Sequence, residues 1–206
     1  METHSKYGLY IEKIIKMINQ NNLIRTFDIL LSLFGFLFFS LIIFIVICIN
    51  YFKNDSVFFF QERVGINLKP FKLIKFKTMI SGTKNDATHL IDPSSVTNFG
   101  KFLRKFKLDE LPQLLNVLIG DMSLVGPRPN LLSQDELIKE RSKLHIYNVR
   151  PGITGLAQVN NIDMSDPKLL AITDAKMVKN FNLLNYFKYI LLTIIGNGFR
   201  DKIKID

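Results

Sequence analysis

The chain has 206 residues, of which 48% are hydrophobic, and its formal net charge is +9. This length favours one membrane segment with one modest domain and argues against a multidomain machine. The basic balance suits nucleic acid or anionic lipid equally, but 18 Phe residues and no Trp favour a membrane surface.

Residues 1–24 are expected to form a short amphipathic helix at the membrane interface. Apolar residues such as Ile11, Ile14 and Ile18 are interspersed there with Lys13 and Lys16. A soluble packing helix is the alternative that this pattern leaves open.

Residues 25–53 are expected to form a membrane helix. No charged residue occurs from Ile29 to Phe52, and about 24 residues can cross a hydrocarbon core of about 30 Å. Basic residues flank this run on both sides, so charge selects no crossing direction. A single-pass helix and a re-entrant helix, which returns to the same face, both remain open. The single cysteine, Cys48, lies inside the run, so the sequence predicts neither an intrachain disulfide nor a Cys-rich metal site.

Residues 54–206 are expected to form one membrane-associated catalytic domain, which makes the chain an α+β protein. Segments 57–60 and 71–79 favour a small β-hairpin, and 81–98 reads as a surface loop. From Phe99 to Phe106 the apolar residues follow helical spacing and basic residues fill the other positions, as in an interfacial helix.

A second interfacial helix is predicted from Leu183 to Ile195. There Lys188 is surrounded by Tyr186, Phe187 and Tyr189, aromatic residues of the kind that lie at headgroup level. A terminal core helix explains the same residues equally well.

Asp109 and Glu110 are the first candidates for chemistry. The run Leu108–Gly120 predicts a helix with Pro112 in its first turn and Gly120 at its end. Both carboxylates then lie at a helix N-terminus, where free N–H groups favour negative charge and help to hold a phosphate. Ordinary helix capping is the more common explanation for acidic residues at such a place.

The surroundings of Asp109 and Glu110 favour chemistry over capping. A strongly basic helix precedes them and Gly126-Pro127-Arg128-Pro129 follows, so anions are expected here. One carboxylate can attack phosphorus while its neighbour binds a divalent cation. Arg128 lies between two prolines, whose stiff backbone suits the presentation of a guanidinium to a phosphate or a base edge, although an ordinary loop arginine is the alternative.

Residues 150–160 combine a rigid turn, two glycines and polar groups that lead into a predicted short strand, and this combination suits a nucleotide pocket. The chain lacks a P-loop and a dinucleotide-binding glycine triplet. His4, His89 and His145 lack metal-ligand spacing and are interpreted as surface or packing residues.

Taken together, these motifs resemble the bacterial sugar transferases called monotopic phosphoglycosyl transferases, in the minimal form that consists of the catalytic unit alone. The resemblance extends from about residue 22 to about residue 196. The matching segments are 25–28, 58–65, 75–79, 103–105, 108–113, 116–118, 120–129 and 150–160.

The resemblance implies a ping-pong reaction at the cytoplasmic face of the bacterial inner membrane. Asp109 is then the nucleophile that takes a phosphosugar from a UDP-sugar and releases UMP, and polyprenyl phosphate captures the sugar phosphate. Glu110 is the expected Mg²⁺ ligand, and the membrane helix is expected to be re-entrant. The residues expected to bind the substrates are Arg63, Arg104, Pro127, Arg128, Pro129, Thr154 and Gln158.

Some positions depart from the family pattern. Leu41 replaces the proline that usually helps to bend the re-entrant helix, and Asn160-Asn161-Ile162 lacks the arginine usual near the donor. The competing hypothesis is a non-catalytic adaptor that binds anionic lipids or partner proteins, whereas nucleic-acid binding lacks a recognisable module. The choice of UDP-sugar and the formation of a homodimer stay open.

Overall fold

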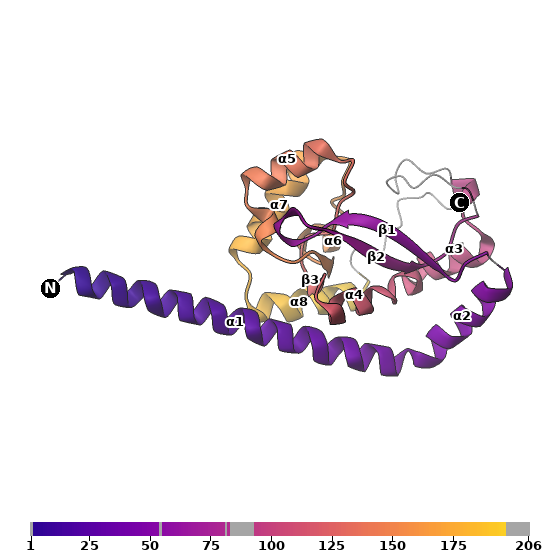
Figure 1. Ribbon diagram of the computed structural model, residues 1–206, viewed down its shortest axis with the longest axis horizontal. Coiled ribbons are helices and arrows are strands. Elements are labelled where there is room, and N and C mark those ends of the chain that lie inside the picture. Colours follow the sequence, from indigo (N-terminus) through magenta and orange to yellow (C-terminus); the bar gives the residue numbers. More distant parts are fainter. Residues whose placement is uncertain (1, 54, 81, 83–92, 197–206) are drawn as a thin grey trace.

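The computed structural model describes residues 2–53, 55–80, 82 and 93–196, with side chains for all of these except 2–19 and 93. Long and short helices combine with two small two-stranded sheets. A long N-terminal helix runs along one side of a domain that contains both sheets (Figure 1). The α+β prediction is therefore confirmed.

The predicted membrane segment, 25–53, covers the last part of helix α1 (Glu2–Phe38) and all of helix α2 (Ser40–Lys53). The two helices meet at Phe39. By length and composition, Gln20–Phe38 is the part of α1 that suffices to cross a membrane. The hydroxyl of Ser40 donates to the carbonyl of Leu37 at 2.8 Å, a side-chain bond of the kind that accompanies helix bends. The helix is thus interrupted without the proline that Leu41 replaces.

Helix α1 also continues unbroken through residue 24, where the sequence had suggested the end of a separate amphipathic segment. The side chains of residues 2–19, on which that prediction depends, lie outside the described part, as do His4, His89 and most of the predicted loop 81–98. His145 is exposed, in agreement with its interpretation as a surface residue.

The predicted hairpin is confirmed. Strands β1 (Phe58–Val64) and β2 (Pro70–Phe76) pair antiparallel, with Phe58 opposite Phe76 and Val64 opposite Pro70. The short turn η1 (Ile66–Leu68) joins them. On one face of β2, Phe71 and Leu73 are buried in the core, so this face of the hairpin is turned toward the domain.

Helix α3 (Asn98–Lys105) also agrees with the sequence pattern. Its first turn is capped by Thr97, whose Oγ1 accepts from the backbone N–H of Gly100 at 2.9 Å. A Cβ at Gly100 would lie 2.1 Å from the carbonyl oxygen of Thr78, so this glycine lets α3 approach the chain that follows β2. Phe102 and Phe106 remain exposed.

The prediction of a single helix over 108–120 is wrong in one respect. The chain forms a 3-10 turn, η4 (Leu108–Glu110), and then a separate helix α4 (Gln113–Ile119) that ends at Gly120 with φ 101°. Pro112 separates the two, because it has no N–H to donate to the preceding turn. Asp109 and Glu110 therefore lie in a tight turn before α4 and not in its first turn.

A second sheet joins the two later motifs. Strands β3 (Ser123–Val125) and β4 (Gly152–Thr154) pair in parallel. The short strand predicted with residues 150–160 comes earlier than expected, at β4, and the segment after it, Leu156–Val159, forms the short helix α6. The remaining elements are η3 (Pro93–Ser95), α5 (Asp135–Lys143), η5 (Ile146–Asn148), α7 (Pro167–Lys179) and α8 (Leu183–Ile194).

Helix α8 has two different faces. Tyr186 and Tyr189 are buried in the core with Val125 and Met177, which confirms the core alternative for these tyrosines. Phe187 and Lys188 are exposed. The same helix thus contributes to the core with one face and presents side chains to the outside with the other.

Polar contacts attach both apolar helices to the domain. From α1, Arg25 donates to the carbonyl of Val117 at 2.7 Å, and Asp28 accepts from the hydroxyl of Tyr186 at 2.9 Å. From α2, the amide of Asn50 donates to the carbonyls of Val57 and Lys77, both at 3.2 Å. The two ends of the apolar run therefore contact one and the same domain.

Helix α1 also packs along α4. At one contact between them, a Cβ at Gly35 would lie 3.1 Å from a methyl carbon of Leu114. The absence of a side chain at Gly35 thus allows the helix that follows the carboxylate turn to lie directly against the apolar helix.

Candidate active site

Asp109 and Glu110 lie in a compact turn between α3 and α4. The turn opens at Lys107, whose φ of 54° is left-handed, and i to i+3 backbone bonds from Glu110 and Leu111 close it. A non-glycine residue in this conformation costs about 1–2 kcal/mol, so the surrounding structure must hold it. The Asp109 side chain is buried, with the residue 7% exposed.

Two cations from other parts of the chain converge on Glu110. Its Oε1 accepts from Nζ of Lys75 at 2.7 Å and from Nη2 of Arg128 at 3.0 Å. Lys75 comes from β2, and Arg128 comes from the loop after β3. The structure thus brings together three predicted site residues, Asp109, Glu110 and Arg128, and adds Lys75, which the sequence analysis had not singled out.

The pKa values of Glu110 and Lys107 are both shifted by burial and by neighbouring charges. Burial by itself would raise the pKa of Glu110, but Lys75 and Arg128 outweigh it and hold that pKa well below its ordinary value. Burial lowers the pKa of Lys107, although Glu110 opposes this effect. Glu110 is therefore ionised at neutral pH, and nearby side chains take over the electrostatic role that the sequence had assigned to a helix N-terminus.

The loop that carries Arg128 is held through its main chain. Each carbonyl oxygen from Gly126 to Asn130 accepts a hydrogen bond from a distant part of the chain. The donors, in order, are Gln158 Nε2 (3.1 Å), Gly152 N (2.9 Å), Arg141 Nη1 (2.9 Å), Arg63 Nη1 (3.1 Å) and Val64 N (2.9 Å). We name this segment the 126–130 loop. Its backbone has little freedom to shift.

Three residues that the sequence placed at the substrates support the scaffold instead of meeting Glu110. Arg63 donates to Pro129 and to the side chain of Gln61, and burial together with Arg128 lowers the pKa of Arg63 to about 9. Gln158 bonds Gly126, and Thr154 shares a hydrogen bond with Thr193 of α8.

Within the described part of the chain, the hydrogen bonding of the Arg104 side chain is incomplete, as it also is at Nε of Arg63 and Oε1 of Gln158. On α3, Nε of Arg104 donates to the hydroxyl of Thr78 at 3.0 Å, whereas Nη1 is buried without a hydrogen-bond partner among the described residues. Leaving a buried N–H without a partner costs free energy. Such a donor suits an oxygen atom of a bound substrate.

The two carboxylates of the turn, Asp109 and Glu110, fit a Mg²⁺ ion that is held by few protein ligands. Among the described residues no group of three or more His, Cys, Asp and Glu side chains gathers. Both hydrogen bonds to Glu110 end on Oε1, which leaves Oε2 to face another ligand. Mg²⁺ is commonly held by one or two carboxylates together with substrate phosphates, so Asp109 and Glu110 suffice in number.

A cavity of about 170 Å³ lies on the other side of Pro127, between α1, α7 and the chain around Asn148. Arg25, Asp28 and Arg150 are among its lining residues, and neither Asp109 nor Glu110 is. This cavity is therefore separate from the carboxylate turn.

Two further buried charges escaped the sequence analysis. Arg141 of α5 and Asp174 of α7 form an ion pair at 2.6 Å, with side chains 2% and 0% exposed. Both occur in helices of mixed composition, where a charged residue usually faces solvent. A tertiary contact between α5 and α7 was needed to find them, because no local pattern marks them.

Residues 19–199 match the model of a family described as bacterial sugar transferase. The chain is 39% identical over 171 residues to the sugar transferase EpsL of Bacillus subtilis, which covers 82% of this chain and 84% of the relative.

Longer relatives match as well. A UDP-N-acetylgalactosamine-undecaprenyl-phosphate N-acetylgalactosaminephosphotransferase of Aeromonas hydrophila is 35% identical over 188 residues, 85% of this chain and 44% of the relative. A UDP-glucose:undecaprenyl-phosphate glucose-1-phosphate transferase of Klebsiella pneumoniae is 44% identical over 119 residues, 52% of this chain and 24% of the relative. The chain thus spans less than half of the length of either.

Proposed function

The chain belongs to the bacterial sugar transferase family, and we propose that it transfers a sugar 1-phosphate from a UDP-sugar to polyprenyl phosphate. The names of the Aeromonas and Klebsiella relatives, which describe such transfers to undecaprenyl phosphate, support this proposal. The observation that carries it is the carboxylate turn, where Glu110 is paired with Lys75 and Arg128 directly beside the buried carboxylate of Asp109.

In the first step, a carboxylate oxygen of Asp109 attacks the β-phosphorus of the UDP-sugar. The bond between this phosphorus and the bridging oxygen breaks, and its electron pair leaves with UMP. Asp109 then carries the sugar phosphate as an acyl phosphate.

In the second step, a phosphate oxygen of polyprenyl phosphate attacks the same phosphorus atom. The bond to Asp109 breaks, which regenerates the carboxylate and releases a polyprenyl diphosphate sugar. Two in-line displacements at one phosphorus atom give the ping-pong order.

The cations around the turn stabilise the negative charge that gathers on the phosphates during both steps. Lys75 and Arg128 already pair with Glu110, and Arg104 has a buried Nη1 that suits a substrate oxygen. Preorganised charge of this kind acts without reorganisation during the reaction. Pro127 and Pro129 restrict the backbone that presents Arg128.

Glu110 would hold Mg²⁺ through Oε2, with Asp109 as a second carboxylate nearby. When bound, this ion neutralises the phosphates under attack. Because Lys75 and Arg128 keep Glu110 ionised, the protein prepares the ligand in its charged form.

The apolar surface supports a position in a membrane. Helices α4 and α8 pack against α1, and all three expose large apolar residues, as does α2. The exposed residues include Phe34, Leu37 and Phe38 of α1, Leu41, Phe44 and Phe52 of α2, Ile119 of α4, and Leu184 and Ile194 of α8. Continuous apolar surface of this kind suits lipid.

We further propose that α1 and α2 form a re-entrant helix pair and that residues 54–206 lie on the cytoplasmic face of the bacterial inner membrane. Arg25 and Asn50, near the two ends of the apolar run, both bond the same domain, and the helix is interrupted at Phe39. A straight single-pass helix of this length would separate its ends by about 30 Å or more.

The function is tested with the full chain in detergent, with Mg²⁺, polyprenyl phosphate and a panel of UDP-sugars. Release of UMP that depends on one UDP-sugar is expected, and without acceptor the intact mass should increase by one sugar phosphate. Salt-sensitive binding to anionic liposomes without UMP release from any UDP-sugar would contradict the proposal and favour the adaptor.

Topology is tested by labelling single cysteines in sealed membrane vesicles in a Cys48→Ala background. A cysteine near Met1 and one at Ser142, which is exposed on the domain, should react from the same side. Reaction from opposite sides would exclude re-entry.

A further inference from the structure

The pair formed by Arg141 and Asp174 lies outside the carboxylate turn, yet it reaches the main chain of Arg128. We propose that Arg141 is a positioning residue for the transfer: it fixes the backbone of the 126–130 loop so that the guanidinium of Arg128 meets Glu110. This inference rests on the proposed function, because Arg128 is expected to act on the phosphates.

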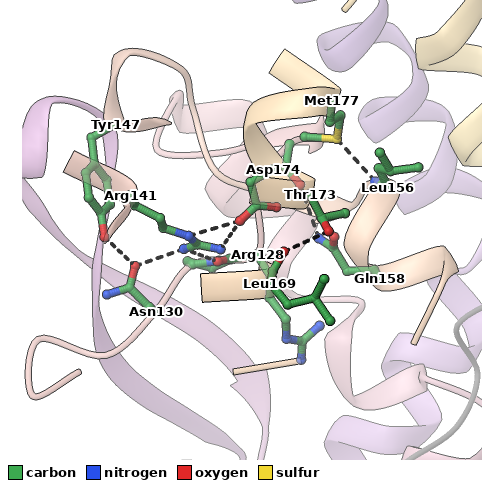
Figure 2. A network of polar contacts seen from close by, with 12 residues as sticks. Arg128, Asn130, Arg141, Tyr147, Leu156, Gln158, Leu169, Thr173, Asp174 and Met177 are labelled. Carbon is green, nitrogen blue, oxygen red and sulfur yellow. Dashed lines mark hydrogen bonds and ion pairs between the residues drawn. The ribbon is translucent and has the colours of Figure 1, made fainter. Parts of the chain in front are cut away.

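All three nitrogens of the Arg141 guanidinium are used (Figure 2). Nε and Nη2 donate to Oδ2 of Asp174 at 3.0 and 2.6 Å, and Nη1 donates to the carbonyl of Arg128 at 2.9 Å and to Oδ1 of Asn130 at 3.0 Å. The rigid fork of arginine thus joins α7 to the loop in one planar group.

Asn130 extends the network. Its Oδ1 also accepts from the hydroxyl of Tyr147 at 2.9 Å, and its own carbonyl accepts from Val64 of β1. The residue after Pro129 is therefore held from η5 and from the hairpin as well. Arg141 stands at the centre of these contacts.

A gain in folding stability does not by itself explain the buried ion pair of Arg141 and Asp174. Asp174 and Arg141 are both buried, and burial raises the pKa of Asp174 although Arg141 opposes that rise. A buried ion pair commonly adds little net stability compared with apolar residues of the same volume. Its directional contacts, by contrast, specify one arrangement of the backbone.

The carbonyl of Arg128 matters because it belongs to the residue that carries the guanidinium. Other donors hold the neighbouring carbonyls of Pro127 and Pro129, and the contact with Arg141 orients the carbonyl of Arg128 itself. The side chain of Arg128 is 39% exposed, which means that packing does not lock its outer part. A shift at its base is therefore carried to the guanidinium at Glu110.

The test is a double-mutant cycle in kcat for UMP release. Arg141→Lys keeps a positive charge beside Asp174 but loses the fork, and we expect kcat to fall at least about tenfold, because displacements near 1 Å cost up to about a hundredfold. In an Arg128→Met background, the same substitution should change kcat by less than about twofold, because the group that it positions is gone. Full additivity of the two losses would overturn the proposal.

A matched control separates positioning from general stability. Asn182→Ala removes the N-cap of α8, where the Asn182 side chain accepts from the backbone N–H of Asn185 at 2.9 Å and bonds no residue of the 126–130 loop. This control should lower Tm while leaving kcat within about twofold of the wild type, and its effect should add to that of Arg128→Met. If it lowers kcat as much as Arg141→Lys does, the loss reflects stability and the proposal fails.

Tyr147→Phe is a milder variant in case Arg141→Lys does not fold. It removes only the hydroxyl that donates to Asn130, and we expect a loss in kcat in the same direction, about two- to fivefold, that disappears in the Arg128→Met background. An unchanged kcat would contradict the proposed network.

Hydrogen exchange gives a readout that needs no turnover. A peptide covering residues 121–133 should exchange faster in Arg141→Lys than in the wild type, and at the wild-type rate in Asn182→Ala. Equal exchange in Arg141→Lys would overturn the positioning role. If the wild type releases no UMP from any UDP-sugar, the proposed function fails while this comparison still decides whether Arg141 holds the loop.

Discussion

Two loops meet at Glu110, and they are built in opposite ways. The carboxylate turn is closed by local i to i+3 bonds and opens on a left-handed Lys107. The 126–130 loop is held at each carbonyl by a donor from a distant part of the chain. The first loop supplies the reactive groups, and the second supplies a cation at a fixed place.

This difference suggests a division of labour. A turn that depends on local bonds can accept a covalent change at Asp109 without disturbing the rest of the domain. A loop that depends on remote bonds keeps Arg128 in place while that change occurs. Substitutions in the two loops should accordingly separate chemistry from stability.

The largest effect is expected from Asp109→Asn. Without a nucleophilic carboxylate, UMP release should fall at least about a thousandfold. Thermal stability should stay within about 1 kcal/mol, because the turn keeps its local bonds. The measurement is single-turnover UMP release next to thermal unfolding, and full activity in this variant would refute the nucleophile.

Gly152→Ala tests the support of the 126–130 loop, because the backbone N–H of Gly152 donates to the carbonyl of Pro127. A Cβ there would lie 1.9 Å from the backbone nitrogen of Gly126, so the parallel pairing of β3 and β4 must open. We expect a loss of about 3 kcal/mol in the free energy of unfolding, measured with denaturant. The exposed Ser142→Ala serves as the control and should change it by less than about 0.5 kcal/mol.

Arg128→Lys tests the contact between the two loops, in which Arg128 pairs with Glu110. Lysine retains the charge but loses the guanidinium fork, and we expect kcat/KM to fall about ten- to a hundredfold with little loss of stability. Lys139→Arg, on an exposed part of α5, is the matched control for exchange of the two cations. A wild-type kcat/KM in Arg128→Lys would mean that the fork is dispensable.

The smallest effect concerns stability and pH. Lys75 and Arg128 hold the folded pKa of Glu110 below its ordinary value of 4.5, so its ion pairs stabilise the protein above that pH and lose their effect as pH falls below it. Glu110→Gln should therefore destabilise the protein by about 1 kcal/mol at pH 7, a figure reduced for solvent screening, and by less at pH 3. Thermal unfolding of both proteins across this range checks it; a gap that widens on acidification would contradict the assignment.

Local patterns predicted part of this molecule well. The apolar run 57–60 and the alternation of apolar and basic residues in 71–79 predicted the hairpin, and helical spacing from Phe99 predicted α3. The sequence also identified Asp109, Glu110 and Arg128, because unusual residue types at a turn and between two prolines are visible without a structure. These are features that a few neighbouring residues determine.

Features that depend on tertiary contacts were missed or misplaced. Lys75 reaches Glu110 only because of where β2 packs, and Arg141 meets Asp174 only because α5 lies on α7. Pro112 was read as part of one helix, although its missing N–H divides η4 from α4. Arg63 and Gln158 carry polar groups that serve carbonyls of the loop, a use that no motif reveals.

The close approach of Gly35 to Leu114 has a mechanical consequence. Leu114 lies in the helix that begins just after the carboxylate turn, and Gly35 lies in the apolar helix below it. Because Gly35 has no side chain to separate the two helices, the depth proposed for the apolar helix in lipid would also set the height of Asp109 above the hydrocarbon. We therefore expect the rate of the proposed transfer to change with the acyl-chain length of the lipid.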